Sequence, residues 1–352
     1  MQDSSILDEL DLALVNAVQI APRGSWQVLG SVLGVDPSTV ARRWQRITEL
    51  GLVWMTAYAR LTVPSSFVLG CVEIDCVPAH RDRLATVLAR LPQVVSVHHV
   101  GSGRDLFVLI NARNLTALSR FVLDELSHQP GVRRTSVQPA TTVYSEGGHW
   151  RLDALSPRQR AELARHALKR TRQGVVTEAD RDLLVALSTE GRRSVAELAA
   201  LTDTSVSTAR RRLRRLIDGG LMSIRCEVAQ SLTGWPVSAI FWANVPPDEL
   251  SEVGRRLAKL PEIRFCAAVT GEHNLVMIVW LRSPEDGQRL EEYLAAHLPS
   301  LSLAERAITL RQLKRQTRLL DDLGRSIEIV PADPWAELHL NTRPTLLGRS
   351  SA

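Results

Sequence analysis

The chain opens with apolar residues spaced every three to four positions over residues 7–19, which predicts an amphipathic helix. A second helix is predicted over 26–33. A third is predicted over 38–50, because Gly34 supplies a turn and Pro37 suits a first helical position. Three helices with a short glycine-containing turn before the last are typical of a helix-turn-helix unit, and the strand predicted over 52–61 would link this unit to the next domain.

Strand and helix patterns then alternate in a second part. The predicted order is strand 66–77, helix 79–90, strands 94–100 and 106–112, helix 115–128 and strand 132–144. The order βαββαβ indicates a ferredoxin-like fold, an antiparallel sheet with both helices on one face.

The whole arrangement occurs twice. Residues 169 positions apart match without a gap, for example Asp11 with Asp180 and Gly51-Leu52 with Gly220-Leu221. The second copy repeats the elements as helices 178–189, 195–201 and 205–218, strand 221–230, strand 237–245, helix 247–259, strands 263–270 and 275–282, helix 284–298 and strand 303–313. The predicted fold class is α+β, with two winged-type helix-turn-helix domains and two ferredoxin-like domains in tandem.

Six segments follow from these patterns. They are helix-turn-helix domain 1–62, ferredoxin-like domain 63–144, linker 145–176 with a connecting helix over 156–172, helix-turn-helix domain 177–232, ferredoxin-like domain 233–322 and tail 323–352. The tail contains Pro331, Pro334 and Pro344 among few apolar runs, so we expect it to be poorly ordered.

Both faces of the predicted sheets are apolar. Val276, Ile278 and Trp280 alternate with Met277 and Val279, whereas helices cover one face alone. The second face must be buried against another element, and the matching sheet of another copy is the natural partner. Copies could pair within one chain or between two, and we expect a homo-oligomer formed through these sheets.

Composition adds a preference for anions. The 352 residues carry 43 Lys and Arg against 38 Asp and Glu, and only Lys169, Lys259 and Lys314 are lysines. Arginine holds phosphate and guanine in a planar fork, which favours a nucleic-acid partner, although a GC-rich genome would also enrich arginine. No apolar run is long enough for a membrane span and no signal peptide begins the chain, so a cytoplasmic protein is expected. The four cysteines lack metal-ligand or disulfide spacing, and no cofactor or catalytic motif is evident.

Several short motifs occur in order in this chain. They are Leu7-Asp8-Glu9-Leu10-Asp11, the stretch Val35 to Arg43 across the turn, Gly51-Leu52, Leu91-Pro92, and Val269-Thr270-Gly271-Glu272-His273-Asn274-Leu275. With their repeats they cover both copies, and together they resemble the Lrp/AsnC (feast/famine) family of prokaryotic transcription regulators. The resemblance implies binding to double-stranded DNA under the control of a small-molecule effector, often an amino acid.

The third helix of each copy carries the candidate DNA-binding residues, because a recognition helix places its N-terminal residues at base edges while flanking basic residues contact phosphate. They are Ser38, Thr39, Arg42, Arg43 and Arg46 in copy one, and Ser205, Ser207, Thr208, Arg210, Arg211, Arg212, Arg214 and Arg215 in copy two. Five arginines within six residues cover more than one helical face, so some must be salt-bridged or contact phosphate. Copy one has Trp44 where copy two has Leu213, which predicts that the two recognition helices differ.

The resemblance places the effector at the turn between the second and third sheet strands, where neighbouring effector domains meet. The candidate residues are Gly101, Ser102, Gly103, Arg104 and Asp105 in copy one, and Thr270, Gly271, Glu272, His273 and Asn274 in copy two. Backbone N–H groups beside Gly271 or the Arg104 guanidinium suit a carboxylate, and Glu272 or Asn274 suits an ammonium. An ordinary hairpin turn would also explain the glycines. His98 and His99 point to opposite faces of a strand, so no metal site is expected there.

Two other classes of protein remain open. Sirohaem decarboxylases share this two-part fold but typically carry an R-R-I-G-type stretch after the third helix, which neither 52–58 nor 221–226 matches. The other class is a metabolite sensor without DNA binding, against which the arginine-rich third helices argue.

Overall fold

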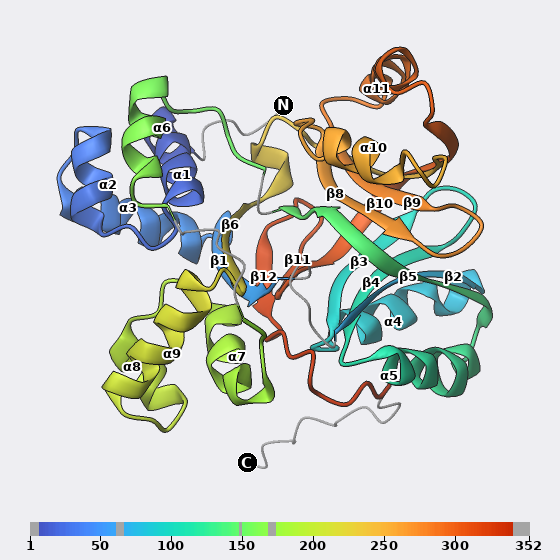
Figure 1. Ribbon diagram of the computed structural model, residues 1–352, viewed down its shortest axis with the longest axis horizontal. Helices are drawn as coiled ribbons and strands as arrows, with labels where there is room; N and C mark the ends of the chain where they lie inside the picture. The colour runs from blue at the N-terminus through green and yellow to red at the C-terminus, as the bar shows by residue number, and fades with distance from the viewer. Residues whose placement is uncertain (1–6, 61–66, 148–149, 168–173, 341–352) are drawn as a thin grey trace, which may run out of the picture.

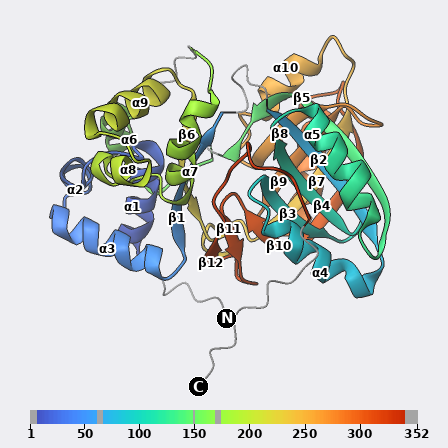
Figure 2. The ribbon, with the colours of Figure 1, turned by 90° about the horizontal axis from the view of Figure 1, so that it is seen from below.

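The computed structural model describes residues 7–60, 67–147, 150–167 and 174–340. Two helical units lie side by side in one half of the molecule, and a curved sheet with helices on its outside fills the other half (Figures 1 and 2). The predicted strand ends at Leu61 and Ser66, the end of the connecting helix at Arg172 and the tail from 341 lie outside the described residues.

Each helical unit contains three helices followed by a strand. The elements are α1 (Glu9–Ile20), α2 (Trp26–Leu33), α3 (Pro37–Glu49) and β1 (Val53–Ala59) in copy one, and α7 (Arg181–Thr189), α8 (Val195–Leu201), α9 (Val206–Asp218) and β6 (Met222–Val228) in copy two. A 3₁₀ turn, Glu178–Asp180, leads into α7. Local signals set these bounds: the Asp36 carboxylate accepts from the Ser38 N–H at 2.8 Å, and Gly34 ends α2 at φ 71°.

The two helical units share one apolar core and a two-fold pseudosymmetry. Strands β1 and β6 pair antiparallel, with Thr56 opposite Arg225, its own equivalent in the repeat. Arg23 donates to the carbonyls of Gly191 and Arg193 at 2.7 and 2.8 Å. Its equivalent Arg192 donates in return to two carbonyls of the α1–α2 loop, both at 2.7 Å. The copies therefore pair within one chain.

The second half of the molecule comprises the strands and helices of both ferredoxin-like units. They are β2 (Val68–Cys76), α4 (Pro78–Ala89), β3 (Val94–Val100), β4 (Leu106–Ala112), α5 (Leu115–Arg120) and β5 (Val132–Ser145), then β7 (Val237–Asn244), α10 (Leu250–Leu257), β8 (Ile263–Val269), β9 (Leu275–Leu281), α11 (Glu285–His297) and β10 (Ser302–Arg315). The predicted helix over 115–128 ends early as α5 and continues as a π-helical turn, Phe121–Glu125, and a 3₁₀ turn, Leu126–His128.

The second face of each sheet is buried against the sheet of the other copy, as predicted, but the two ferredoxin-like units are not clearly separate domains. The long strand β5 pairs with β2 of its own copy and with β8 of the other, and β10 pairs with β7 and β3 in the same way. The order β3-β4-β2-β5-β8-β9-β7-β10 returns to β3, so eight strands close into one barrel-like sheet. The apolar inner faces meet inside it, where Phe107 packs edge-on against Trp242 with ring centroids 5.8 Å apart.

The closed barrel shows that the two copies pair within one chain, which the sequence had left open. The long strands β5 and β10 find all their pairing partners within the chain, so the two copies pair through these strands without a second chain. Helices α4 and α5 pack on the outside with one core, and α10 and α11 with another.

Residues 324–340 are ordered, which contradicts the prediction for the start of the tail. Strand β11 (Arg318–Leu320) pairs with β10, and β12 (Ser326–Ile329) pairs with β11. Trp335 is buried in the helical core, and the Arg181 guanidinium binds the Asp333 carboxylate at 2.7 Å. The connecting helix is also shorter than predicted, because α6 spans Pro157–Ala164.

Lys314 on β10 is fully buried, and its ammonium donates to the Leu91 carbonyl at 2.7 Å. Burial disfavours the charged form and lowers the pKa of Lys314 from 10.5 to about 7.

We expect the Lys314 charge to make stability depend on pH. Between pH 7 and 10.5 the unfolded chain keeps a proton that folded Lys314 has lost, so the free energy of unfolding rises with pH, by at most about 1.4 kcal/mol per unit. Lys314→Met removes this contribution. The free energy of unfolding, measured in urea at pH 7, 8, 9 and 10, should rise with pH more steeply in the wild type than in the variant. A difference between the two proteins that does not change with pH would contradict a lowered pKa of Lys314.

Candidate nucleic-acid interface and effector turns

Two of the three candidate arginines on α3 are held by acids of α1. Arg43 Nη1 lies 2.6 Å from Asp8 Oδ2 and 3.0 Å from Asp11 Oδ1, and Arg46 forms an ion pair with the same Asp11, whose side chain is fully buried. These contacts raise the pKa of Arg43 and lower that of Asp8. The pairs orient α3 against α1, so Arg43 and Arg46 have a structural role.

The second copy repeats this arrangement on α9. Arg215 forms an ion pair with the buried Asp180, the equivalent of Asp11, and its Nη1 donates to the Val175 carbonyl at 3.4 Å. Arg212 Nη1 donates to the Ala179 carbonyl at 3.4 Å. The expectation that some arginines of the run are salt-bridged is therefore confirmed for Arg215.

Four candidate arginines remain directed to solvent. Arg42 and its repeat equivalent Arg211 are exposed, and copy two adds exposed Arg210 and Arg214. None of the four has a hydrogen bond or ion pair with any part of the chain that the structure describes. Copy one has Ala41 and Gln45 at the positions of Arg210 and Arg214, so the two helical faces differ in charge.

The polar candidates at the start of each third helix form caps. Ser38 Oγ donates to the Asp36 carboxylate at 2.6 Å, and Thr39 is half-buried beside it. Ser205 Oγ lies 2.9 Å from Ser207 Oγ and 3.0 Å from Thr208 Oγ1. Ser38, Ser205 and Ser207 are exposed.

The difference between Trp44 and Leu213 lies in the core. Both side chains are buried, and Trp44 packs near Trp26 with ring centroids 6.1 Å apart. This pair therefore does not distinguish the outward faces of the two helices; the arginines do.

The turn of copy one places Arg104 in a buried ion-pair cluster. Its Nε lies 3.0 Å from Glu73 Oε2, its Nη2 lies 2.8 Å from Glu305 Oε2, and its guanidinium stacks 4.1 Å from the Trp242 ring centroid. Burial raises the pKa of Glu73, partly offset by Arg104. Arg104 therefore already has two carboxylate partners, while its Nη1 is buried without a hydrogen-bond partner among the described residues, and its role toward an effector stays a prediction.

Asp105 and Asn274 are equivalent residues with one structural role. Asp105 Oδ2 accepts from the Cys76 N–H at 2.8 Å. Asn274 Oδ1 accepts from the equivalent N–H of Val245 at 3.0 Å, and its Nδ2 donates to the Val245 carbonyl at 2.6 Å. Both side chains fix the turn to the end of the neighbouring strand, so the predicted ammonium contact from Asn274 would compete with these bonds.

The remaining turn residues are mostly open to solvent. Gly101, Ser102, Gly103, Thr270, Gly271 and Glu272 are exposed, whereas His273 is buried with its Nε2 3.6 Å from Glu305 Oε1. Each turn contacts the long strand of the other copy: the Gly101 N–H donates to the Ile308 carbonyl at 3.0 Å, and the Thr270 N–H to Pro139 at 3.1 Å. The turns therefore lie at the seam between copies.

Sequence reasoning missed the partners of Arg104, because Glu73, Trp242 and Glu305 come from three distant strands. It also missed three buried arginines, Arg225, Arg264 and Arg315, whose single signal was an arginine inside an otherwise apolar strand pattern. His98 is fully buried, which lowers its pKa to about 3.

The described residues contain neither a cluster of metal-ligating side chains nor a helix with the length and apolarity of a membrane span.

We expect the arginines of α9 to differ in how much their substitution lowers the free energy of unfolding. Arg215→Ala leaves the buried Asp180 without its charged partner and should lower the free energy of unfolding by about 1–3 kcal/mol. Arg211→Ala removes an exposed side chain and should change it by less than about 0.5 kcal/mol. Urea unfolding of both variants measures this; equal losses would show that the Asp180 pair does not hold α9.

Comparisons with known proteins agree with this anatomy. The profile of the Lrp/AsnC ligand binding domain matches residues 70–149 and again 238–319, the AsnC-type helix-turn-helix domain matches 7–47, and a winged helix-turn-helix DNA-binding domain matches 177–221.

Relatives match about one copy of this chain. An uncharacterised HTH-type transcriptional regulator of Pyrococcus abyssi is 29% identical over 144 residues, 40% of this chain and 90% of its own. The HTH-type transcriptional regulator FL11 of Pyrococcus horikoshii is 24% identical over 143 residues, 40% of this chain and 94% of its own. A solved sirohaem decarboxylase, in complex with an iron-uroporphyrin III analogue, covers 88% of this chain and 93% of its own with a TM-score of 0.57 and 16% identity, so it shares the fold. Because these family domains occur twice and in the same order, the chain is a tandemly duplicated member of the Lrp/AsnC family.

Proposed function

We propose that this protein is a sequence-specific DNA-binding regulator of transcription that reads DNA with α3 and α9. The observation that supports this most is the set Arg42, Arg210, Arg211 and Arg214, exposed and without partners among the described residues on the third helices of two helix-turn-helix units. Arginines left uncompensated on such a helix favour contacts to phosphate and to guanine. The protein would then act where the chromosome lies, in the cytoplasm.

The pseudosymmetry of the chain suggests the form of the DNA site. One chain presents two third helices, as a dimer of single-copy regulators would, so we expect two half-sites about one helical turn, roughly 34–36 Å, apart. Because Arg210 and Arg214 have no counterpart in copy one, the half-sites should differ in sequence and copy two should contribute more phosphate contacts.

We infer that a small metabolite, of which an amino acid is the first candidate, modulates this binding at the turns. Gly101, Ser102, Gly103, Thr270, Gly271 and Glu272 are open there, and Arg104 and His273 lie just behind them. Two or more chains that associate at these exposed turns would enclose a ligand between them. The sheets of the two copies already pair within one chain, so an oligomer would form through the turns. By linkage, effector and DNA would then change each other's affinity by the same factor.

We expect a triple variant, Arg210→Gln with Arg211→Gln and Arg214→Gln, to bind all DNA more weakly. Each lost phosphate contact lowers the slope of log K against log salt by about 0.9, so the loss of up to three should lower the slope by up to roughly 3. Fluorescence anisotropy from 50 to 300 mM salt measures both effects.

A matched control removes the same charge elsewhere. Arg83, Arg133 and Arg134 are exposed on α4 and β5 of the barrel half, and changing all three to Gln should leave the salt slope unchanged. If both triple variants lose the same affinity, net charge and not α9 binds DNA.

The specific function is tested with DNA from upstream of the protein's own gene against a scrambled sequence, with and without single amino acids. A preference for the native sequence, and a footprint with a repeat of about 10 bp, supports the regulator. Binding that is equally weak on both DNAs and unchanged by any amino acid contradicts autoregulation through the turns.

A second candidate function is an enzyme resembling sirohaem decarboxylases. It is favoured by one observation, the whole-chain similarity in fold, which single-copy regulators do not share because they match half the chain. The strands that follow each third helix lack the stretch typical of those enzymes.

The absorbance of an added iron-porphyrin carboxylate discriminates between these functions. A regulator should leave the Soret band and its intensity unchanged, and should leave the number of carboxylates, counted by mass spectrometry, unchanged as well. A stoichiometric shift of the band followed by loss of 44 Da per carboxylate would establish the enzyme.

A further inference from the structure

A partly open space lies between the β1–β6 ribbon and the barrel. It has a volume of about 110 Å³ and is lined by both halves of the molecule, including Tyr58 from β1, Arg225 from β6, and Arg264 and Trp280 from the barrel. It is at the opposite end of the β3–β4 and β8–β9 hairpins from the effector turns, since Ser96 and Asn111, near the other ends of β3 and β4, line it.

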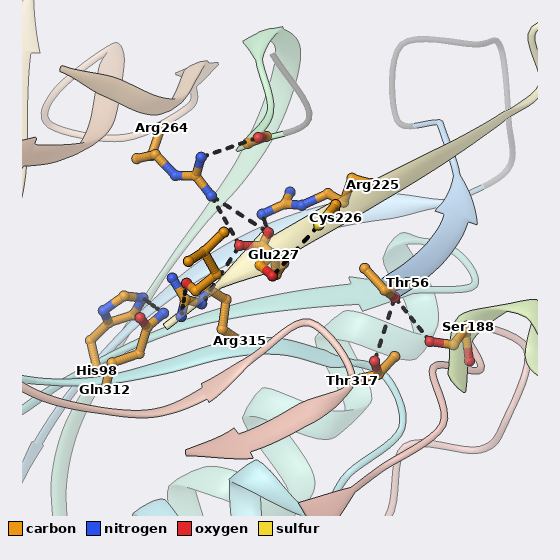
Figure 3. A network of polar contacts seen from close by, with 12 residues as sticks. Thr56, His98, Ser188, Arg225, Cys226, Glu227, Arg264, Gln312, Arg315 and Thr317 are labelled. Carbon is orange, nitrogen blue, oxygen red and sulfur yellow. Dashed lines mark hydrogen bonds and ion pairs between the residues drawn. The ribbon is translucent and has the colours of Figure 1, made fainter. Parts of the chain in front are cut away.

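Three buried arginines meet at this cavity around one carboxylate (Figure 3). Glu227 forms an ion pair with Arg225, its Oε2 lies 3.1 Å from Arg264 Nη2, and it lies 3.8 Å from Arg315 Nε. Each of the four side chains is more than nine-tenths buried. Burial lowers the pKa of Arg315 to about 9, so its guanidinium keeps its charge at neutral pH.

Donors of this cluster are left over after the internal bonds are counted. Arg264 Nη1 donates to the Gly147 carbonyl at 3.2 Å, and Arg315 Nη2 donates to the Val228 carbonyl at 3.1 Å. Arg225 Nε and Arg315 Nη1 are buried without a hydrogen-bond partner among the described residues. Buried donors of a charged group nearly always have a partner, so an acceptor in the cavity would complete the cluster.

The charge balance indicates how many anionic groups the cavity takes. Three guanidinium groups form ion pairs with one carboxylate, Glu227, and a second carboxylate, Glu146, lines the same cavity, which leaves one positive charge. His98, which also lines the cavity, adds none because its pKa is lowered to about 3. One monovalent anionic group would neutralise the site.

The rest of the wall is apolar and aromatic. Phe265, Ile278, Leu109 and Trp280 line the cavity, and the Arg264 and Arg315 guanidinium carbons lie 4.0 and 5.3 Å from the Trp280 ring centroid. A closed cavity of roughly 150 Å³ holds benzene, so this one of 110 Å³, which is partly open to solvent, takes the carboxylate and the inner part of a ring, while the rest of the ring lies at the opening.

We propose that this cavity binds a small organic monocarboxylate with an apolar body. The carboxylate accepts from Arg225 Nε and Arg315 Nη1, and the apolar body packs against Trp280. The proposal does not depend on DNA binding, and the site differs from the effector turns in both place and chemistry.

The test uses the full-length protein and benzoate as the probe, followed by isothermal titration calorimetry and by quenching of tryptophan fluorescence. We expect one benzoate per chain with a dissociation constant on the order of 1 mM or tighter. Benzamide, the neutral isostere, and acetate, which lacks the apolar body, should bind at least 10-fold more weakly, and inorganic phosphate should not compete. Benzamide binding equal to that of benzoate, or no benzoate binding, overturns the proposal.

Variants identify the site. Arg315→Gln should weaken benzoate about 10- to 100-fold, the effect of one charge-assisted hydrogen bond, whereas Arg318→Gln, a buried arginine that does not line the cavity, should not. Glu227→Gln removes a competing carboxylate and should tighten benzoate, which a purely structural role would not produce. Equal affinities of the Arg315 and Arg318 variants overturn the assignment, and if a variant does not fold, the comparison of benzoate with benzamide on the wild type decides.

Discussion

The structure depends on the need of a sheet to satisfy its edges and bury both of its faces. A ferredoxin-like unit alone leaves an unpaired strand at each edge and an apolar face opposite its helices. Strands β5 and β10, each 14 residues long, meet both needs by pairing at one end with their own copy and at the other with the second copy. The same crossing places each hairpin turn against the opposite copy and brings the N-terminal units together.

Duplication within one chain removes a constraint that identical subunits obey. In a symmetric dimer every residue on the two-fold axis meets its own copy, whereas here equivalents differ. Thr56 faces Arg225 in the β1–β6 ribbon, and Glu146 occupies the position equivalent to Arg315. Three arginines can therefore surround one carboxylate beside the pseudo-axis without a second set of three, and the two third helices can carry different charge.

The arginines fall into three groups that differ in their burial and in their ion-pair partners. Arg46 pairs with the buried Asp11 of α1, and Arg215 pairs with the buried Asp180 at the start of α7, so both hold the third helices in place. Arg42, Arg210, Arg211 and Arg214 are exposed and form no ion pair or hydrogen bond within the described chain. Arg225, Arg264 and Arg315 are buried around Glu227, and Arg225 and Arg315 each keep a donor without a hydrogen-bond partner in the described chain. Position in the fold thus divides one residue type into three groups: arginines that pack helices, arginines proposed to contact DNA, and arginines that line the cavity between the two halves.

Local patterns alone determined much of this protein, because helix caps, glycine turns and two-residue alternation act over a few residues. The bounds of α2, α8, β3 and β4 and the repeat of 169 residues are evident in the sequence. Tertiary structure alone decided the closure of the barrel, which depends on hydrogen bonds between strands far apart in the chain. It also decided the order of residues 324–340, because Asp333 and Trp335 contact the distant helical units. It also decided that Arg104 and Asn274 are already engaged, and that Arg225, Arg264 and Arg315 meet, since separate strands bring those side chains together only when the barrel closes.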